Sequence, residues 1–137
     1  MIPVILLLAF LAAQDAVSVK PQLDYAFFRD RVQPIFLAKR PGHARCVVCH
    51  DHTNPRLQPL VPGAKSWTEE QSRKNFQAWQ YVVVPGNPMK SRLCLHPLAE
   101  SAGGDPFHPG GKHFKSREDP EWKTLAAWVN GETETSK

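Results

Sequence analysis

The chain has 137 residues, a formal net charge of +4, and 42% hydrophobic and 9% aromatic residues, which fits one globular domain of about 115–120 residues behind a leader. Its 13 Pro and 8 Gly predict long irregular stretches between short helices. No run of basic residues is interleaved with aromatic ones on one regular element, which argues against nucleic-acid binding.

The first 13 residues, MIPVILLLAFLAA, form an uninterrupted apolar run that ends at Gln14 and Asp15. The run predicts either an export signal or a retained N-terminal anchor. It is too short to cross a membrane as a helix, which takes about 20 residues. Either role predicts an exported, periplasmic protein, and retention adds a membrane contact through residues 1–13. We therefore divide the chain into a leader or anchor (1–16), a folded domain (17–131) and a polar tail (132–137).

After a linker over residues 17–23, the first helix is predicted to begin with Asp24 as its N-cap. Pro34 interrupts it, so a kink or a new turn is expected there, because proline is best accepted in a first turn. Pro41-Gly42 then predicts a turn. The apolar face of this helix comprises Leu23, Phe27, Phe28, Val32, Ile35 and Phe36.

Next comes Cys46-Val47-Val48-Cys49-His50, a C-x-x-C-H pattern typical of covalent c-type haem attachment. Two thiols three positions apart on one helical turn can each add to a vinyl group of one haem, and the following imidazole is then carried under the iron. Cys46 and Cys49 are therefore predicted to form thioethers and His50 to be the proximal ligand.

The two cysteines allow three other interpretations. A zinc site could add Cys94 and a histidine, but no second closely spaced ligand pair exists. A thioredoxin-like redox pair would need a βαβ pattern around it, which is absent from the sequence. A plain structural disulfide is the third alternative.

Residues 51–65 contain three prolines and no periodicity, which predicts a loop along the haem edge. Ser66 or Thr68 begins the next helix, because each has Glu or Gln three residues later. Residues 85–88 (PGNP) predict a turn, in which Asn87 can cap a short helix that starts at Pro88. The expected features of these two helices are the i,i+4 pairs Glu69–Arg73 and Glu70–Lys74, the inward residues Phe76, Trp79 and Val83, and Met89, Leu93 and Leu95 on the short helix.

Residues 99–118 are polar and glycine-rich, and we expect a structured loop over the second haem face. The final helix is predicted to have Asp119 as its cap, Pro120 at its first position and Gly131 at its end. Its apolar stripe is Trp122, Leu125, Ala126 and Val129.

Basic residues crowd the segment before the motif and could steer docking onto an acidic partner surface; they are Arg29, Arg31, Lys39, Arg40 and Arg45. Cys94 has no partner once the motif holds haem, so it is interpreted as a small buried apolar residue. His43 and His52 flank the motif and are expected to be structural or to lie near the haem propionates.

Three segments carry a resemblance to a known family. They are F-x-x-x-V-x-P-I-F from Phe28 to Phe36, the haem motif, and L-x-x-W-V from Leu125 to Val129 followed by Gly131. Together they resemble a class I-like monohaem cytochrome c. Residues 83–93, VVPGNPMKSRL, make the chain most similar to the planctomycete-type cytochrome c domain. The resemblance covers residues 27–131 and implies an all-α fold, with short helices and long loops wrapped around one covalent haem.

The distal iron ligand is where the chain departs from this family. Relatives commonly place Met-Pro shortly before the last helix, whereas this chain has Phe107-His108-Pro109-Gly110-Gly111. The resemblance therefore implies His108 as the first candidate for the distal ligand. His96 is the second candidate and Met89 the third, and His113 or an open position completes the alternatives.

The expected function is electron transfer by a single haem, because the sequence has no second cluster of catalytic side chains. The alternative is a haem enzyme or gas sensor with a displaceable distal ligand. A third class is a fixed subunit of a membrane complex, such as an oxidase or a photosynthetic reaction centre, to which the retained anchor would tether the domain.

Overall fold

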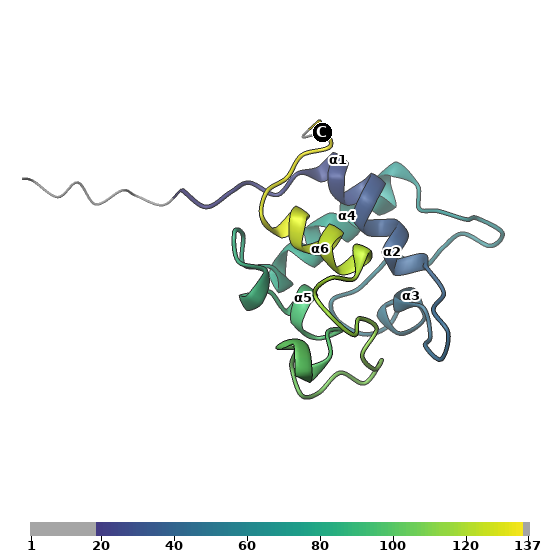
Figure 1. Cartoon of the computed structure of the whole chain (residues 1–137). Helices are drawn as coiled ribbons and strands as arrows, with labels where there is room; N and C mark the ends of the chain where they lie inside the picture. The colour runs from purple at the N-terminus through teal and green to yellow at the C-terminus, as the bar shows by residue number, and fades with distance from the viewer. Residues whose placement is uncertain (1–18, 136–137) are drawn as a thin grey trace, which may run out of the picture.

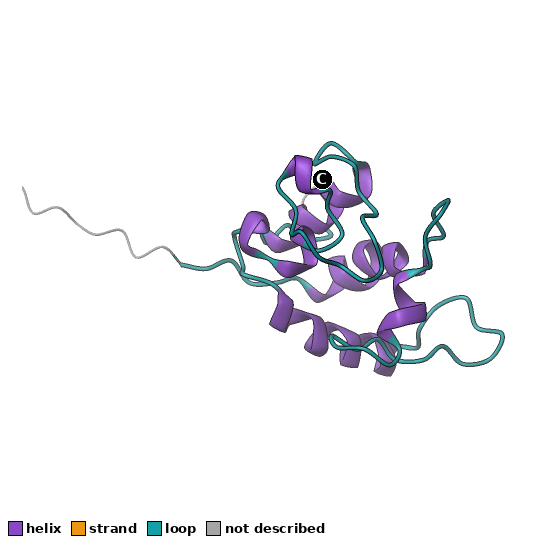
Figure 2. Ribbon diagram, turned by 90° about the horizontal axis from the view of Figure 1, so that it is seen from below, coloured by secondary structure: helices purple, strands orange, loops and turns teal. Residues whose placement is uncertain are grey.

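The computed structural model describes residues 19–135, and within them every regular element is a helix (Figures 1 and 2). The nearest approach to sheet structure is one isolated bridge between Leu98 and Phe114. The all-α prediction is therefore confirmed for these residues, none of whose helices is long and apolar enough to cross a membrane. The predicted leader or anchor (1–16) lies outside the described residues, as do the last two residues of the tail.

The first helical stretch consists of α1 (Tyr25–Phe27), the π-helical segment η1 (Phe28–Val32) and α2 (Gln33–Leu37). The side chain of Asp24 accepts a hydrogen bond from the Phe27 N–H at 2.6 Å, so the predicted cap is confirmed. Proline lacks an N–H, so Pro34 cannot donate to a carbonyl in the preceding turn. The widened turn accommodates it: the Gln33 N–H reaches the Phe28 carbonyl, and α2 starts there with Pro34 in its first turn.

The last helix, α6 (Pro120–Val129), packs beside this first stretch (Figure 1). Asp119 caps it through its side chain, and the predicted stripe Trp122, Leu125, Ala126 and Val129 is buried. Trp128 is fully buried as well. Its ring centroid lies 5.0 Å from that of Phe28, and its indole N–H donates to the Asp24 carbonyl at 2.9 Å. These contacts fasten the last helix to the first helical stretch, so the two ends of the domain stabilise each other.

A third helix, α4 (Glu69–Trp79), continues into the 3₁₀ turn η2 (Gln80–Val82). Of the two predicted starts, Thr68 is the cap, and it forms a capping box with Gln71. Both predicted i,i+4 ion pairs are present. A buried amide chain fastens this helix to α2: Asn75 donates to Gln33 at 3.0 Å, and Gln33 donates to the Ser72 hydroxyl at 2.9 Å.

The short helix predicted from Pro88 is two pieces, η3 (Pro88–Lys90) and α5 (Arg92–Leu95). Asn87 stands before η3, but its side chain makes no capping bond. The break falls at buried Ser91, whose hydroxyl donates to the Asn87 carbonyl at 2.8 Å and accepts from the Val84 N–H at 2.9 Å. A side chain that bonds backbone groups in this way competes with a continuous helix. After α5, one further turn, η4 (Glu100–Ala102), lies in the otherwise irregular stretch 99–118.

Candidate functional site

The C-x-x-C-H motif is the short helix α3 (Cys46–His50), which follows the predicted turn at residues 41–42. Val47 buries its side chain in the core and fixes the helix, while Val48 is 48% exposed. Cys46 and Cys49 are both free, partly buried thiols on one helical turn. Burial raises the pKa of the Cys46 thiol, and the nearby Arg40 guanidinium offsets part of that rise.

His50 is held by the loop that follows it. Its Nδ1 lies 2.8 Å from the Pro55 carbonyl oxygen, and the Leu57 N–H donates to the His50 carbonyl at 2.7 Å. Because a carbonyl oxygen can only accept, Nδ1 must carry the proton. The lone pair of His50 is therefore on Nε2, the atom left for an external ligand or metal. Trp79 packs edge-on to the ring, with centroids 5.0 Å apart.

His108 has the same arrangement in the loop 99–118. Its Nδ1 lies 2.7 Å from the Gly111 carbonyl oxygen, so Nδ1 is protonated and Nε2 holds the lone pair. The ring also rests against Gly110, where an added Cβ would lie only 3.0 Å from His108 Cε1. A bare glycine backbone is needed for this close approach. The half-buried imidazole is thus fixed on two sides.

Burial and neighbouring polar groups shift the pKa of His108. The pKa of His108 is lowered first by burial and further by electrostatic interactions with His96, His50 and Lys112, while the hydrogen bond to Gly111 opposes the shift. In Figure 1, α3 and the green loop that carries His108 both lie in the lower part of the domain, away from the C-terminus. His50 thus contributes to the electrostatic environment of the His108 ring.

The second distal candidate, His96, has both ring nitrogens engaged. Nδ1 donates to the Asp105 carboxylate, and Nε2 accepts from Arg92 Nε at 3.0 Å and from Arg92 Nη2 at 2.8 Å. A guanidinium can only donate, so these bonds occupy the lone pair that a metal would need. These hydrogen bonds were not predicted from the sequence, although the i,i+4 spacing of Arg92, the first residue of α5, and His96, its C-cap, was a signal for the contact with Arg92.

The third distal candidate, Met89, lies in η3 and packs on the core. Its terminal methyl sits 3.1 Å from the position that a Cβ on Gly103 would take. Its thioether is therefore in an apolar packing contact at the end of η4. The free thiol of Cys94, as predicted, is completely buried.

Two further histidines, His43 and His113, connect the loop that carries His108 to the segment before the motif. The rings of His43 and His113 lie 4.5 Å apart, and His113 Nε2 donates to the Gly110 carbonyl at 3.1 Å. Burial and the neighbouring His43 lower the pKa of His113 to about 4. The predicted structural role of His43 therefore has a concrete contact, and His52 is instead an exposed partner of Asp51.

Two buried polar atoms in this region have no hydrogen-bond partner among the described residues: Arg40 Nη1 and His113 Nδ1. Arg40 pairs with Glu121 through its other terminal nitrogen and stacks on Phe114, with its guanidinium carbon 5.1 Å from the ring centroid. Buried polar groups in proteins are normally satisfied by protein atoms or by ordered water, so each of these two atoms can take a further hydrogen-bond partner. No local sequence pattern distinguishes Arg40, because Glu121 is far away in the chain.

Most of the basic residues before the motif are neutralised within the domain. Arg29 pairs with Asp30 and Glu69, Arg31 with Glu134, and Arg40 with Glu121. Lys39 and Arg45 take part in no ion pair formed within residues 19–135. Among the basic residues before the motif, Lys39 and Arg45 are therefore the two whose positive charge remains available.

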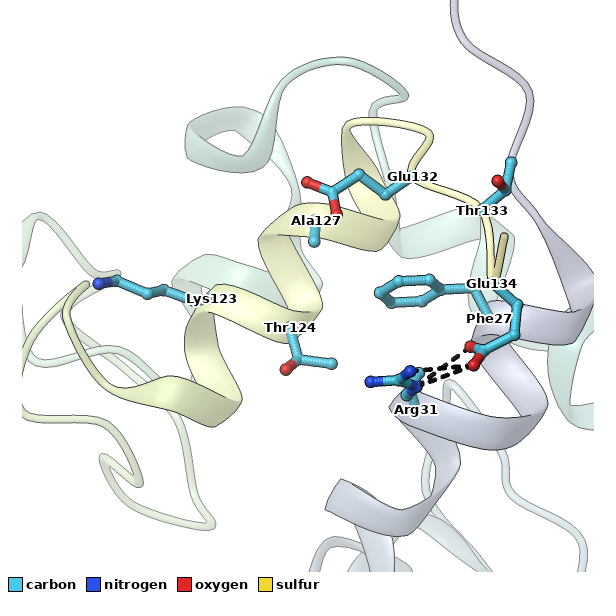
Figure 3. A pocket seen from close by; sticks show the side chains of 8 residues that line it. All are labelled: Phe27, Arg31, Lys123, Thr124, Ala127, Glu132, Thr133 and Glu134. Carbon is cyan, nitrogen blue, oxygen red and sulfur yellow. Dashed lines mark hydrogen bonds and ion pairs between the residues drawn. The ribbon is translucent and has the colours of Figure 1, made fainter. Parts of the chain in front are cut away.

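Two cavities lie away from the motif. One, of about 360 Å³, is lined by α6, the first helical stretch and residues 132–134, with the Arg31–Glu134 ion pair at its edge (Figure 3). The other, of about 450 Å³, lies between α2 and residues 65–67. No residue of the motif lines either cavity. The candidate site is therefore described by the sulfur and nitrogen atoms of its cysteines and histidines, not by a cavity.

Within the described part of the chain, no three His, Cys, Asp or Glu side chains are grouped so that they could hold a metal ion by themselves. The alternative zinc site that includes Cys94 is thus not assembled among the described residues. Comparisons with protein-family models, with curated proteins and with solved structures found no match.

Proposed function

We propose that this protein is a single-haem electron carrier with a class I-like cytochrome c fold. Cys46 and Cys49 would bind haem c through thioethers, and His50 would ligate its iron from the proximal side. One observation carries the proposal: two free thiols and His50 lie on one helical turn, and His50 and His108, from distant segments, each donate through Nδ1 and so leave Nε2 for a metal.

His108 is the distal ligand in this proposal. Its Nε2 lone pair is available, whereas the Nε2 of His96 is occupied by Arg92. The chemistry of the remaining donors also suits a haem, because the unpaired N–H of Arg40 could be satisfied by an acceptor such as a carboxylate or a water beside it.

Bound haem supplies a centre that changes oxidation state by one electron. The chain's own residues would keep the geometry around that centre constant. Pro55 and Gly111 hold the two imidazoles through short hydrogen bonds, and Trp79 and Gly110 pack against the rings. Ligands held by such outer partners rearrange little, which favours electron transfer over substrate chemistry.

A redox partner with an acidic surface is part of the proposal. Lys39 and Arg45 precede α3 with their charges available, and Val48 exposes an apolar side chain on α3 between the two cysteines in sequence. Positive charges near an exposed apolar side chain suit brief docking of an acidic protein. Export and attachment through residues 1–13 complete the proposal. Deleting these residues behind a cleavable signal should release a soluble red protein.

The decisive experiment is denaturing electrophoresis with haem staining of protein from a host with a cytochrome c maturation system. Wild-type polypeptide should keep the haem colour, and the double variant Cys46→Ala, Cys49→Ala should lose it. Cys94→Ala is the matched control, because it removes the third thiol from the core and should remain coloured. A wild-type protein that releases its haem on denaturation would contradict covalent attachment.

A further inference from the structure

We infer that His96 is a positioning residue that sets the plane of the His108 ring. The two rings are stacked, with centroids 5.9 Å apart and planes inclined by 27°. Offset stacking at this separation is a favourable contact between aromatic rings. The inference rests on the proposed function, in which His108 ligates iron, and it adds a residue that acts on the iron only through that ligand.

His96 is suited to this role because it cannot turn. Arg92 donates two hydrogen bonds to its Nε2, and Asp105 accepts one from its Nδ1. The Lys112 ammonium donates to the His96 carbonyl at 3.0 Å and also to the Asp105 carbonyl. The ring therefore has partners on both nitrogens, from α5 and from the loop that carries His108.

His108 needs such a support. Its hydrogen bond to Gly111 and its contact with Gly110 fix the position of the ring along two directions. Neither contact prevents rotation of the ring about the axis that joins Nδ1 to the Gly111 carbonyl oxygen. The His96 ring, which is stacked on the His108 ring, restricts that rotation. In a bis-imidazole haem, the angle between the two ligand planes sets the splitting of the iron d orbitals, so the orientation has an electronic consequence.

Low-temperature electron paramagnetic resonance of the oxidised holoprotein tests the inference, because its g values report that angle. His96→Ala removes the stacked ring, and Arg92→Gln leaves the ring but releases its Nε2. Arg92 is exposed, so the second variant should fold normally. We expect a shift or broadening of the largest g value in both variants, with the larger change for His96→Ala. His52→Ala is the matched control, since it removes another histidine bonded to an adjacent aspartate, and it should leave the g values unchanged.

A near-infrared spectrum of each oxidised sample distinguishes a failure of the proposed distal ligand from a failure of the role inferred for His96. If the wild type lacks the band of two imidazole ligands, the distal assignment of His108 fails. If wild type and variants all have that band, but their g values are identical, His96 does not orient the ring and the inference is overturned. A change in g values of the same size in His52→Ala would overturn it as well.

Discussion

His50 and His108 share one hydrogen-bond pattern: each donates its Nδ1 proton to a backbone carbonyl oxygen, of Pro55 at 2.8 Å and of Gly111 at 2.7 Å. The two segments are far apart in the chain, and neither carbonyl can act as a donor. Both Nε2 atoms are consequently bases, as iron ligation requires. This relationship underlies the first two predictions.

Replacement of His108 by alanine should open one iron position. We expect the oxidised haem to become high-spin and to bind cyanide at least roughly tenfold more tightly, since the site no longer has to release an internal ligand, and reduced protein should bind carbon monoxide. His96→Ala and Met89→Ala are the parallel variants, and both should remain six-coordinate and low-spin. The assignment of His108 is wrong if it is one of these two that becomes high-spin.

Substitution of Gly110 by alanine should weaken the distal bond without removing the ligand. The new Cβ would stand 3.0 Å from His108 Cε1, so the ring must shift, at a cost of about 1–3 kcal/mol. Faster cyanide binding in stopped-flow measurements is the expected result. Gly42→Ala serves as the control: it meets no atom within 4 Å but has a φ of +76°, so it should cost about 1 kcal/mol of stability and leave cyanide binding unaltered.

The third thiol should be unreactive in the native protein. Burial raises the pKa of Cys94 to about 12, so at pH 8 only about one molecule in 10⁴ carries a thiolate there. With Cys46 and Cys49 bound to haem, titration with a thiol reagent should give no reactive group in native protein and one group after unfolding. Because the folded pKa is raised, stability from this group should fall as the pH rises from about 8.5 towards 12, which Cys94→Ala should abolish. Rapid labelling of native protein at pH 8 would contradict the burial of this thiol.

Trp128 should contribute strongly to the stability of the domain. It is fully buried against Phe28 and donates to the Asp24 carbonyl, so Trp128→Ala should lower the free energy of unfolding by roughly 3–5 kcal/mol. Trp128→Phe keeps a packed ring, so it should lower the free energy of unfolding by less. Its effect should include about 1 kcal/mol for the lost hydrogen bond. Chemical denaturation followed by far-ultraviolet circular dichroism measures both. Tyr81→Ala, at a side chain that is 91% exposed, should stay within about 0.5 kcal/mol of wild type.

Charge reversal at Lys39 and Arg45 should slow reaction with an anionic redox reagent. Both positive charges are available beside α3, so the double variant Lys39→Glu, Arg45→Glu should lower the rate of oxidation by ferricyanide, most of all at low ionic strength. Lys20→Glu changes charge in the N-terminal segment, away from the motif, and should have a smaller effect. Equal slowing by both changes would indicate an effect of net charge alone.

Local patterns predicted most of the helical framework. Asp24, Thr68 and Asp119 act on backbone groups within three residues, so their roles as caps are visible in a short stretch of sequence. The missed break at Ser91 has a local cause too, but it depends on the burial of a hydroxyl. Propensity alone cannot foresee that burial, because it follows from packing.

The proposed chemistry of the motif rests on the sequence alone, because Cys46, Cys49 and His50 are so close in the chain that they lie on one short helix. The choice among the distant candidates depended on the tertiary structure. His96 and His108 are chemically identical side chains, and only contacts made after folding, with Asp105 in one case and Gly110 in the other, give them different surroundings. Likewise, Arg40 is an ordinary basic residue until the fold brings Glu121 beside it and buries its other nitrogen without a partner. Hydrogen-bond state and burial are properties of three-dimensional neighbours, so the tertiary structure decided them.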